Sequence, residues 1–363
     1  MSFKPRQVKH VHEKIEGVAY DDEVTVVIDG DILAFKAASA VETRFIQVTH
    51  TKTGKVKRFP NRTSFYGRGK NKDGGWLSEV NSKRKKPFTL EDFTIEDDRE
   101  VEDISHAFHI IKSMVDTTCE RCKTSKYEIY LEEGKNFRNY VCTAFPYKGN
   151  RSGMIKPILL KEVRTYMEDH FAAKVIKGDP CLETDDMCAI RATEGYKDYL
   201  EKGKCTTIQS SLDKDSLSVA GLNFNIDKME EPLFIEGYGE TYLDTKGKLR
   251  GHGKKWLFSQ MLMGDKIDNI LPSKLSGKKF GDKGTFKVLE NTNTFTEGLQ
   301  AVVNKYKEWY PEPIEYEHCF TGEKLEGTWL SLASEFFILL YMRETEDDDT
   351  TFTKLLKENN IEY

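Results

Sequence analysis

Carboxylate side chains recur at one kind of place in this 363-residue sequence, directly after short apolar runs. In VVIDGDILAF, the apolar run 24–28 ends in Asp29 and Asp31. The later acids that follow apolar runs or stand close together are Glu132 with Glu133, Glu183 with Asp185 and Asp186, Asp213 with Asp215, and Asp265 with Asp268. If these groups meet in space, they cannot all ionise unless cations balance them. Oxygen ligands of this kind favour the hard divalent ions Mg²⁺ and Mn²⁺.

The acids converge only if the apolar runs are neighbouring parallel strands. Strand patterns at 24–28, 127–131, 174–176 and 205–210 alternate with helical patterns at 32–40, 101–119, 157–171 and 183–200. This alternation predicts an α/β fold with a mainly parallel sheet flanked by helices. Ligands of such sheets bind outside the carboxyl ends of the strands. Two metal ions about 3.5–4 Å apart at that edge would clamp the attacking and leaving oxygens of a phosphodiester.

Each acid also has a plainer interpretation. A single Asp after a strand is most often a turn former or a helix N-cap. Asp31 in particular would favour a helix N-terminus electrostatically. The recurrence of acids at matching strand ends is harder to explain in this way, so the sequence favours a metal site.

Basic residues are placed to hold a phosphate from the other side. The loop AFPYKGNRSG carries Lys148 and Arg151, spaced to reach one phosphate from a helix start. A second candidate lies between helical patterns at 256–263 and 284–291, where backbone amides and lysines would hold a DNA phosphate without reading sequence. Its residues are Lys274, Gly277, Lys278, Lys279, Gly281 and Lys283. An ordinary solvated basic loop is the alternative for both segments.

Composition limits the class of protein. Hydrophobic residues make up 38% and charged residues 32%, and the net charge is −5. No run approaches the ~18 apolar residues of a membrane span, and the first residues lack the apolar segment of a signal peptide. The seven cysteines are an odd, scattered set, which suits a reducing compartment better than a disulfide framework. The predicted location is the cytoplasm.

The patterns divide the chain into an N-terminal extension (1–23), an α/β catalytic domain (24–255) and a helical DNA-binding region (256–363). The catalytic domain carries an insertion at 45–100. A hairpin is predicted there from strands 45–50 and 55–59, followed by a mobile loop at 61–87. The insertion is basic over 52–86 and acidic over 91–103. It would hold duplex or single-stranded nucleic acid through its lysines and arginines, or it would be a partner surface.

Taken together, the motifs resemble the 5′ nuclease superfamily of flap endonucleases and phage 5′→3′ exonucleases. VIDGDILAFKAASA resembles the family's opening strand, LETDDMCAI its E-x-D-D helix and SLDKDS its DxD motif. YLEEGKNFRNYVCTAFPYKGNR resembles its acid, aromatic-Arg and YKxNR stretch, and GDKIDNILPS resembles GDxxDN, which opens a helix–three-turn–helix element. The resemblance implies a PIN-like or resolvase-like α/β fold with a C-terminal helix–three-turn–helix region.

The resemblance also implies a two-ion Mg²⁺ site in which Mn²⁺ substitutes. The implied ligands of the first ion are Asp29, Glu133 (with Glu132 as the alternative), Glu183 and Asp185, and those nearer the second are Asp186, Asp213, Asp215, Asp265 and Asp268. Lys148 and Arg151 would act on the scissile phosphate, and Tyr147 would lie at the base of the arch that admits the 5′ strand. The turn SKLSGKKFGDKG departs from the family's G-x-x-G-x-G-x-K, which carries a K⁺-assisted phosphate contact.

The predicted activity is metal-dependent hydrolysis of DNA at 5′ ends or flaps, with RNA–DNA hybrids as a further substrate. A monomer that works with replication proteins is expected, in the host cytoplasm if the origin is a phage. One alternative is a haloacid-dehalogenase-type phosphatase with Asp29 as nucleophile, and another is a DNA-binding module without catalysis. A zinc site from His106, His109, Cys119 and Cys122 would need ligands about 15 Å apart on one helix.

Overall fold

The computed structural model describes residues 23–69 and 73–363, so residues 1–22 of the predicted N-terminal extension lie outside the described residues. The chain divides into two compact units. Unit 1 is Met1–Leu33, Lys112–Ile155 and Arg164–Tyr363, and unit 2 is Ala34–Ile111 and Lys156–Val163. The predicted insertion falls in unit 2, whereas the carboxyl-terminal helical region falls in unit 1 together with the strands of the α/β region.

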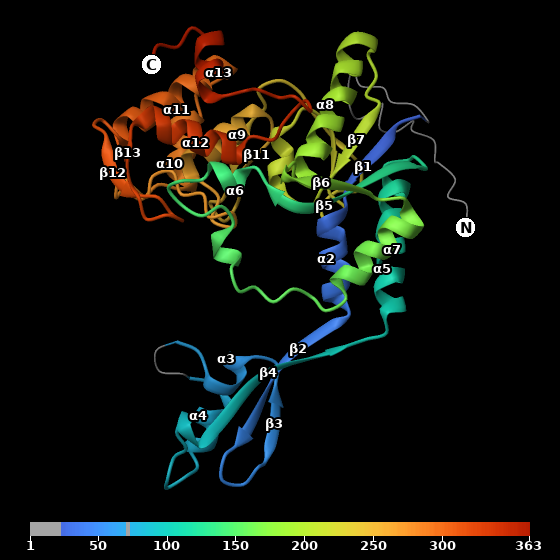
Figure 1. Ribbon diagram of the computed structural model, residues 1–363, viewed down its shortest axis with the longest axis vertical. Helices are drawn as coiled ribbons and strands as arrows, with labels where there is room; N and C mark the ends of the chain where they lie inside the picture. The colour runs from blue at the N-terminus through green and yellow to red at the C-terminus, as the bar shows by residue number, and fades with distance from the viewer. Residues whose placement is uncertain (1–22, 70–72) are drawn as a thin grey trace. The chain divides into compact units, whose positions relative to one another are not determined.

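A six-stranded sheet forms the centre of unit 1 (Figure 1). In spatial order its strands are β6 (Lys174–Cys181), β5 (Lys126–Asn136), β1 (Thr25–Asp29), β7 (Thr207–Ser210), β8 (Gly221–Phe224) and β9 (Leu233–Ile235). All neighbouring pairs are parallel except β8 with β9. The apolar run of β1 explains its central place, because Val26, Val27 and Ile28 are fully buried. The predicted mainly parallel sheet is confirmed.

Helices flank this sheet, as predicted. α8 (Thr184–Lys202) packs against β1, β5, β7 and β8. Three further helices, α2 (Gly30–Ala40), α5 (Ile104–Arg121) and α7 (Leu160–Phe171), each begin in one unit and end in the other. The short elements are α6 (Arg138–Val141) and the 3₁₀ helices η2 (Gly149–Arg151) and η3 (Lys214–Ser218). Among the described residues, no helix is long and apolar enough to cross a membrane.

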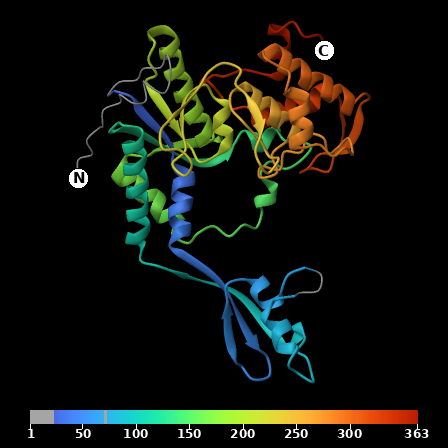
Figure 2. The same ribbon diagram turned by 180° about the vertical axis from the view of Figure 1, so that it is seen from behind.

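The C-terminal helices form one core (Figure 2, orange to red). They are α9 (Lys254–Met263), α10 (Asp282–Leu289), α11 (Phe295–Trp309), α12 (Trp329–Leu340) and α13 (Phe352–Glu358). Two small hairpins accompany them, β10 (Thr241–Leu243) with β11 (Leu249–Gly251) and β12 (Ile314–Glu317) with β13 (Lys324–Gly327). Cys142, Ala144 and Tyr147 belong to the same apolar core. Packing of these helices therefore fixes the loop that carries Lys148.

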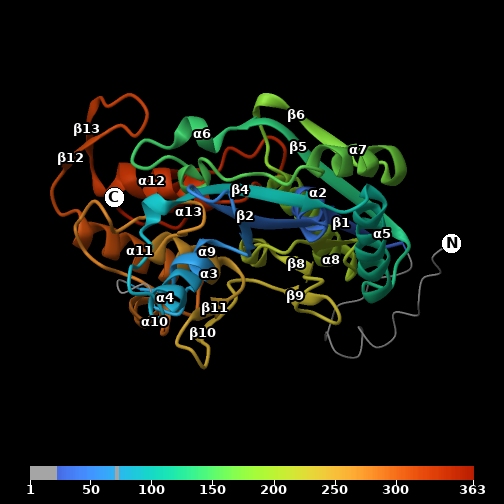
Figure 3. The same cartoon turned by 90° about the horizontal axis from the view of Figure 1, so that it is seen from below.

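Unit 2 is a three-stranded antiparallel sheet with two short helices. Its elements are β2 (Glu42–His50), β3 (Val56–Phe59), α3 (Arg62–Tyr66), α4 (Trp76–Asn81), the 3₁₀ helix η1 (Leu90–Asp92) and β4 (Phe93–Val101). The predicted β2–β3 hairpin is confirmed, and β4 lies beside β2 over its whole length (Figure 3). The prediction of a mobile loop at 61–87 is wrong, because buried Phe65 and Leu77 anchor α3 and α4 to the sheet.

The backbone at the end of β1 is packed so closely that only glycine fits at position 30. A Cβ on Gly30 would lie 2.5 Å from the carbonyl oxygen of Tyr130. We expect Gly30→Ala to lower the free energy of unfolding by about 1–3 kcal/mol through overpacking, as measured by urea denaturation. The matched control is Gly281→Ala, because Gly281 has an extended φ of −171° and no atom within 4 Å of its Cβ position. Equal stability of the two variants would contradict the close packing.

Candidate active site

The sheet brings the predicted acids to one edge. Asp29 is the last residue of β1, which lies between β5 and β7. The parallel register places Glu132 two residues beyond the partner of Asp29 on β5, and Asp213 follows the end of β7. Asp185 lies in the first turn of α8, which packs against β1. These four residues come from separate segments of unit 1 and share the carboxyl edge of the sheet.

Four of the acids form what we call the carboxylate cluster, namely Asp29, Asp185, Asp213 and Asp215. Burial, together with the charge of Asp213, raises the pKa of Asp29 to about 6. Burial and the charges of Asp29 and Asp213 raise the pKa of Asp185 well above its ordinary value. Burial and Asp213 likewise raise the pKa of Asp215 to about 7. Mutual repulsion of this kind requires the carboxylates to lie close together in a poorly solvated place.

Two of the neighbouring acids also serve the fold. The Oδ1 of Asp29 accepts hydrogen bonds from the backbone amides of Asp31 and Ile32, at 3.1 and 3.3 Å, and so caps α2. The Oδ2 of Asp31 accepts a hydrogen bond from the Thr184 hydroxyl at 2.7 Å, and its carboxylate pairs with Arg164. Asp31 therefore joins the start of α2 to the start of α8, whereas Asp29 caps a helix and also belongs to the cluster.

The cluster fits a divalent cation by its chemistry. The Oδ1 of Asp185 is buried and has no hydrogen-bond partner among the described residues. A buried polar oxygen without a hydrogen-bond partner is unfavourable unless a ligand binds to it. Carboxylate oxygens are the ligands that Mg²⁺ and Mn²⁺ prefer. Among the described residues, no three His, Cys, Asp or Glu side chains are arranged so that they could hold a metal ion. The ligand set therefore stays a prediction.

Glu183 is the centre of a saturated polar network beside the cluster. Its Oε1 accepts hydrogen bonds from Asn136 at 2.8 Å and Lys148 at 2.6 Å, and its Oε2 from Arg138 at 2.7 Å and the Tyr147 hydroxyl at 3.0 Å. Burial acts to raise the pKa of Glu183, but Arg138 and Lys148 hold it below its ordinary value. Glu183 is thus ionised, and a metal ion would have to share it with these donors.

Asp186, one of the predicted metal ligands, already has partners within the fold. Its two oxygens accept a bidentate pair of hydrogen bonds from Arg138, at 2.7 and 2.8 Å. They also accept hydrogen bonds from the backbone amides of Glu183 and Arg343, both at 3.1 Å. Asp186 is fully buried with these partners, so its charge is already balanced and its lone pairs are used. We assign it to the support of the site.

The structure replaces Glu133 by the alternative Glu132 in the candidate set. Neighbouring residues of a strand point to opposite faces, and Glu133 is the one turned to solvent, where its carboxylate lies 3.5 Å from Lys177 and its side chain is 64% exposed. Burial and the charge of Glu183 raise the pKa of Glu132 to about 7. Glu132 therefore lies within reach of the charges of the site, and Glu133 does not.

A second group of predicted ligands is paired with cations. Lys214, between the two acids of LDKD, contacts Asp265 and donates to Asp215 at 2.8 Å. Burial acts to raise the pKa of Asp265, but Lys214 and backbone amides hold it below its ordinary value. Gln260 on α9 also donates to Asp215, at 2.6 Å. Asp265 is thus neutralised by Lys214, which the sequence had placed within the acidic motif itself.

The predicted phosphate-facing cations lie beside these acids. Lys148 has a left-handed backbone (φ 54°), and its amide donates to the carbonyl of Asp268 at 2.9 Å. Arg151 pairs with the carboxylate of Asp268 at 2.6 Å. Burial raises the pKa of Asp268, although both cations oppose that rise. Lys148 and Arg151 are 27% and 39% exposed, so solvent and ligands can reach them.

The predicted DNA-contacting residues divide into exposed and buried ones. Lys274, Lys278, Lys279 and Lys283 are exposed around the turns between α9 and α10, and Gly281 is the N-cap of α10. Gly277 has a φ of +70°, which glycine adopts freely. Tyr147 is only 6% exposed and hydrogen-bonds Glu183, so it supports the site from within the core and cannot line a strand gateway. The K⁺ contact at this turn stays a prediction.

Arg138 and Lys214 are the important residues that the sequence analysis passed over. Lys214 had a signal, because a lysine between two site acids is well placed to balance them. Arg138 had none beyond its position in the aromatic-Arg motif, since burial of its guanidinium depends on contacts with α8 and with the Tyr341 carbonyl. The spacing argument against a zinc site holds, because α5 is one continuous helix from Ile104 to Arg121 and so separates His109 from Cys119.

We expect Arg138→Met to lower the free energy of unfolding by about 3–5 kcal/mol, because it leaves buried Asp186 without its cation and Glu183 with Lys148 alone. The matched control is Arg250→Met, since Arg250 is 51% exposed and its ion pair with Asp244 is worth only about 0–1 kcal/mol. Urea denaturation of both variants measures the difference. A loss no larger than that of the control would show that Arg138 does not hold the network together.

We expect Asp185→Asn to raise the melting temperature of the metal-free protein at pH 8. Raised pKa values mean that folding takes up protons, so the cluster destabilises the fold as pH rises through about 6 for Asp29 and about 7 for Asp215. The gain should vanish below about pH 3, where the carboxyls are protonated in both the folded and the unfolded state. Added Mg²⁺ or Mn²⁺ should stabilise the wild type more than the variant. Glu133→Gln is the control, and a cation effect equal in all three proteins would contradict a site at Asp185.

A scan against protein-family models and a search of curated proteins find no match. A search of solved structures finds bacteriophage T5 nucleases. One is a flap endonuclease variant described as a pseudo-enzyme–product complex with DNA and metal ions, 15% identical over 70% of this chain and 89% of that chain, with a TM-score of 0.38. A T5 5′-exonuclease mutant is 15% identical over 66% and 80%, with a TM-score of 0.35. A T5 protein co-crystallised with metal ions is 17% identical over 66% and 82%, with the same TM-score.

Proposed function

We propose that the chain is a divalent-metal-dependent 5′ nuclease that hydrolyses phosphodiester bonds in DNA with 5′ ends or flaps. The observation that carries the proposal is the buried carboxylate cluster, with its unpaired Asp185 oxygen, beside Lys148 and Arg151. The resemblance of the motifs to 5′ nucleases supports the choice of substrate. Acids alone would bind a cation, and cations alone would bind a phosphate; together they suit a metal-bound phosphodiester.

Asp29, Asp185, Asp213 and Asp215 would hold the ions, with Glu132 at the edge of the set. A bound pair of Mg²⁺ ions would lower the pKa of a water nucleophile and offset the charge of the phosphate. Raised pKa values in the cluster help here, because a cation that enters converts mutual repulsion into attraction.

Lys148 and Arg151 would meet the scissile phosphate from the opposite side. Without substrate they pair with Glu183 and Asp268, so each is held ready in a charged state. A phosphate offers a guanidinium or an ammonium the same kind of charge-assisted hydrogen bond as a carboxylate does. We infer that the two cations exchange part of these contacts for the phosphate and stabilise the charge that develops in the transition state.

The exposed lysines around the α9–α10 connection and the start of α10 would bind the duplex at a distance from the bond that is cleaved. Lys274, Lys279 and Lys283 offer contacts to phosphate that carry no sequence information, and the amide end of α10 adds a positive dipole. RNA–DNA hybrids, as removed in replication, would bind the same groups, because both backbones present phosphates.

The test is cleavage of a 5′-labelled flap duplex in Mg²⁺ or in EDTA. We expect the wild type to cut in Mg²⁺ alone, and Asp185→Asn and Glu132→Gln to lose about a hundredfold or more in kcat/KM. Glu133→Gln is the matched control and should cut normally, because its side chain points to solvent. Product length separates endonuclease from exonuclease action, and an RNA–DNA hybrid tests the second substrate.

Two outcomes would overturn the proposal. If no 5′-ended substrate is cut although it binds, the chain is a binding module. If DNA is neither cut nor bound but p-nitrophenyl phosphate is hydrolysed, the phosphatase alternative with Asp29 as nucleophile takes its place.

A further inference from the structure

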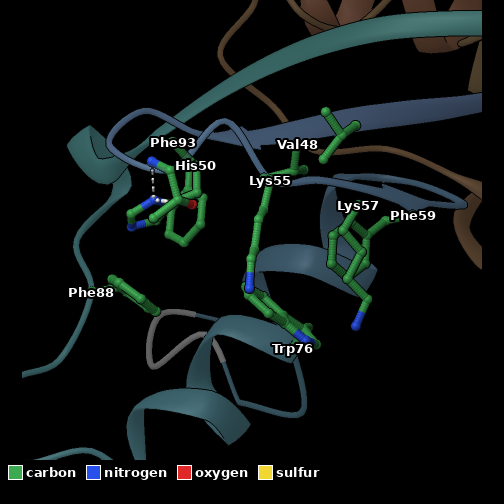
Figure 4. A pocket seen from close by; sticks show the side chains of 10 residues that line it. Val48, His50, Lys55, Lys57, Phe59, Trp76, Phe88 and Phe93 are labelled. Atoms are coloured by element: carbon green, nitrogen blue, oxygen red, sulfur yellow. Dashed lines mark hydrogen bonds between the residues drawn. The ribbon is translucent and has the colours of Figure 1, made fainter.

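Unit 2 contains a pocket of about 420 Å³ that no part of the proposed nuclease site uses (Figure 4). Half of the residues that line it are aromatic, and His50, Trp76, Phe88 and Phe93 are among them. The ring of Phe88 lies 5.1 Å from His50 and 5.3 Å from Phe93, both edge to face. The volume is in the range of pockets that hold small organic groups.

The pocket exists because the two helices cover only part of the sheet. Side chains of one face, including Ile46 and Phe59, are buried beneath Phe65 and Leu77 of α3 and α4. Toward the β2–β3 turn, the same face carries His50 and Lys57, which line the pocket. The side chain of His50 is partly buried, and that of Lys57 is exposed. The open end of an apolar sheet face is thus left to solvent.

Cations surround this aromatic opening. The Lys57 ammonium lies 4.8 Å from the centre of the Trp76 ring, and Lys55 extends across the pocket toward Trp76 (Figure 4). Neither lysine is ion-paired with a carboxylate among the described residues, and no acid lines the pocket. Arg84 belongs to the basic run 83–86, and its guanidinium lies 3.7 Å from the centre of the Phe88 ring.

Three acids of unit 2 already have partners. Asp92 caps η1, because its carboxylate accepts a hydrogen bond from the Thr89 amide at 2.9 Å. This hydrogen bond chiefly lowers the pKa of Asp92, and the charges of Lys52 and His50 lower it further. On β4, Asp97 pairs with Arg62, and Glu100 pairs with Arg58 at 2.5 Å. The pocket therefore presents aromatic rings and unneutralised positive charge, which select an anionic ligand with a flat apolar face.

We propose that this pocket binds a base of single-stranded nucleic acid, while Lys55 and Lys57 contact the phosphates on either side. Aromatic rings within a basic groove bind single strands in this manner without reading sequence. A base that stacks on Trp76 displaces the Lys57 ammonium from the ring and frees it for a phosphate. A duplex is excluded, because its bases are stacked on one another and cannot enter.

An acidic peptide satisfies only half of the pocket. Carboxylates would meet the lysines, but they offer nothing that stacks on Phe88 or Trp76. A base with its phosphates satisfies both the rings and the cations. The proposal does not depend on nuclease activity, because every residue of the pocket belongs to unit 2 and the carboxylate cluster belongs to unit 1.

The experiment is a titration of the full chain with an eight-residue oligothymidylate in EDTA, followed by tryptophan fluorescence. Trp256 and Trp309 are only 2% and 4% exposed, so quenching by a stacked base reports chiefly on Trp76 and Trp329. We expect Phe88→Ala to weaken binding about tenfold, as loss of one base–aromatic stack does. Phe88→Tyr should restore it. A duplex, and an abasic strand of equal length, should bind both proteins equally.

Charge is tested separately, which also covers the case in which Phe88→Ala fails to fold. Lys55→Glu changes an exposed side chain and should weaken oligothymidylate binding severalfold, whereas Lys52→Glu, an exposed lysine of the same turn outside the pocket, is the matched control. The proposal would be overturned if Lys55→Glu and Lys52→Glu weakened oligothymidylate binding equally. It would also be overturned if folded Phe88→Ala bound the oligothymidylate as tightly as the wild type, or if Phe88→Ala weakened binding of the abasic strand to the same extent. Competition by octaglutamate as strong as by the oligonucleotide would overturn it as well, and would assign the pocket to an acidic peptide.

Discussion

The buried guanidinium of Arg138 is the interaction on which the site depends. It joins Glu183 and Asp186 at the start of α8, and it donates to the carbonyl of Tyr341 at 2.7 Å. A charge removed from water in this way is tolerated only when its partners are ionised and well placed. One side chain therefore ties α6, the N-terminus of α8 and the segment after α12 into a fixed arrangement. The position of Glu183, and through it of Lys148, follows from that arrangement.

Charge balance separates the acids of the site into two kinds. Glu183, Asp186, Asp215, Asp265 and Asp268 each have a cation of the protein within hydrogen-bonding distance. Asp29 and Asp185 have no such pair among the described residues; Asp29 raises the pKa of Asp185, and Asp213 raises the pKa of both. The first kind is built into the fold and is stable as it stands. The second kind is the part of the molecule that gains from a cation supplied from outside, which is why the metal proposal rests there and not on the whole acidic set.

The sequence predicted the strand ends well and the use of individual acids poorly. Strand, acid and helix alternate in the printed sequence, so the sheet and the convergence of Asp29, Asp185 and Asp213 followed from parallel topology. Glu132 and Glu133 are adjacent acids, and only the strand's face orientation distinguishes them. Asp186 matched a ligand motif, but Arg138, 48 residues away, takes both of its oxygens. Helices α3 and α4 of unit 2 escaped prediction because Phe65 and Leu77 lie in a polar, Gly-rich stretch without helical periodicity, and their burial comes from tertiary packing.

Under the two proposals, the two units would offer nucleic acid opposite kinds of surface. Acids dominate the candidate active site, so a polyanion would meet it favourably only after metal ions reverse the local charge. Lys55, Lys57 and the rings around them would attract a single strand with no ion bound. Binding and cleavage of nucleic acid would then be separable properties of one chain. Chelation of the metal ions would abolish cleavage and leave much of the affinity for a single strand. A nuclease built in this way would hold its substrate while it waits for metal, because the groups that hold the strand are not the groups that repel it.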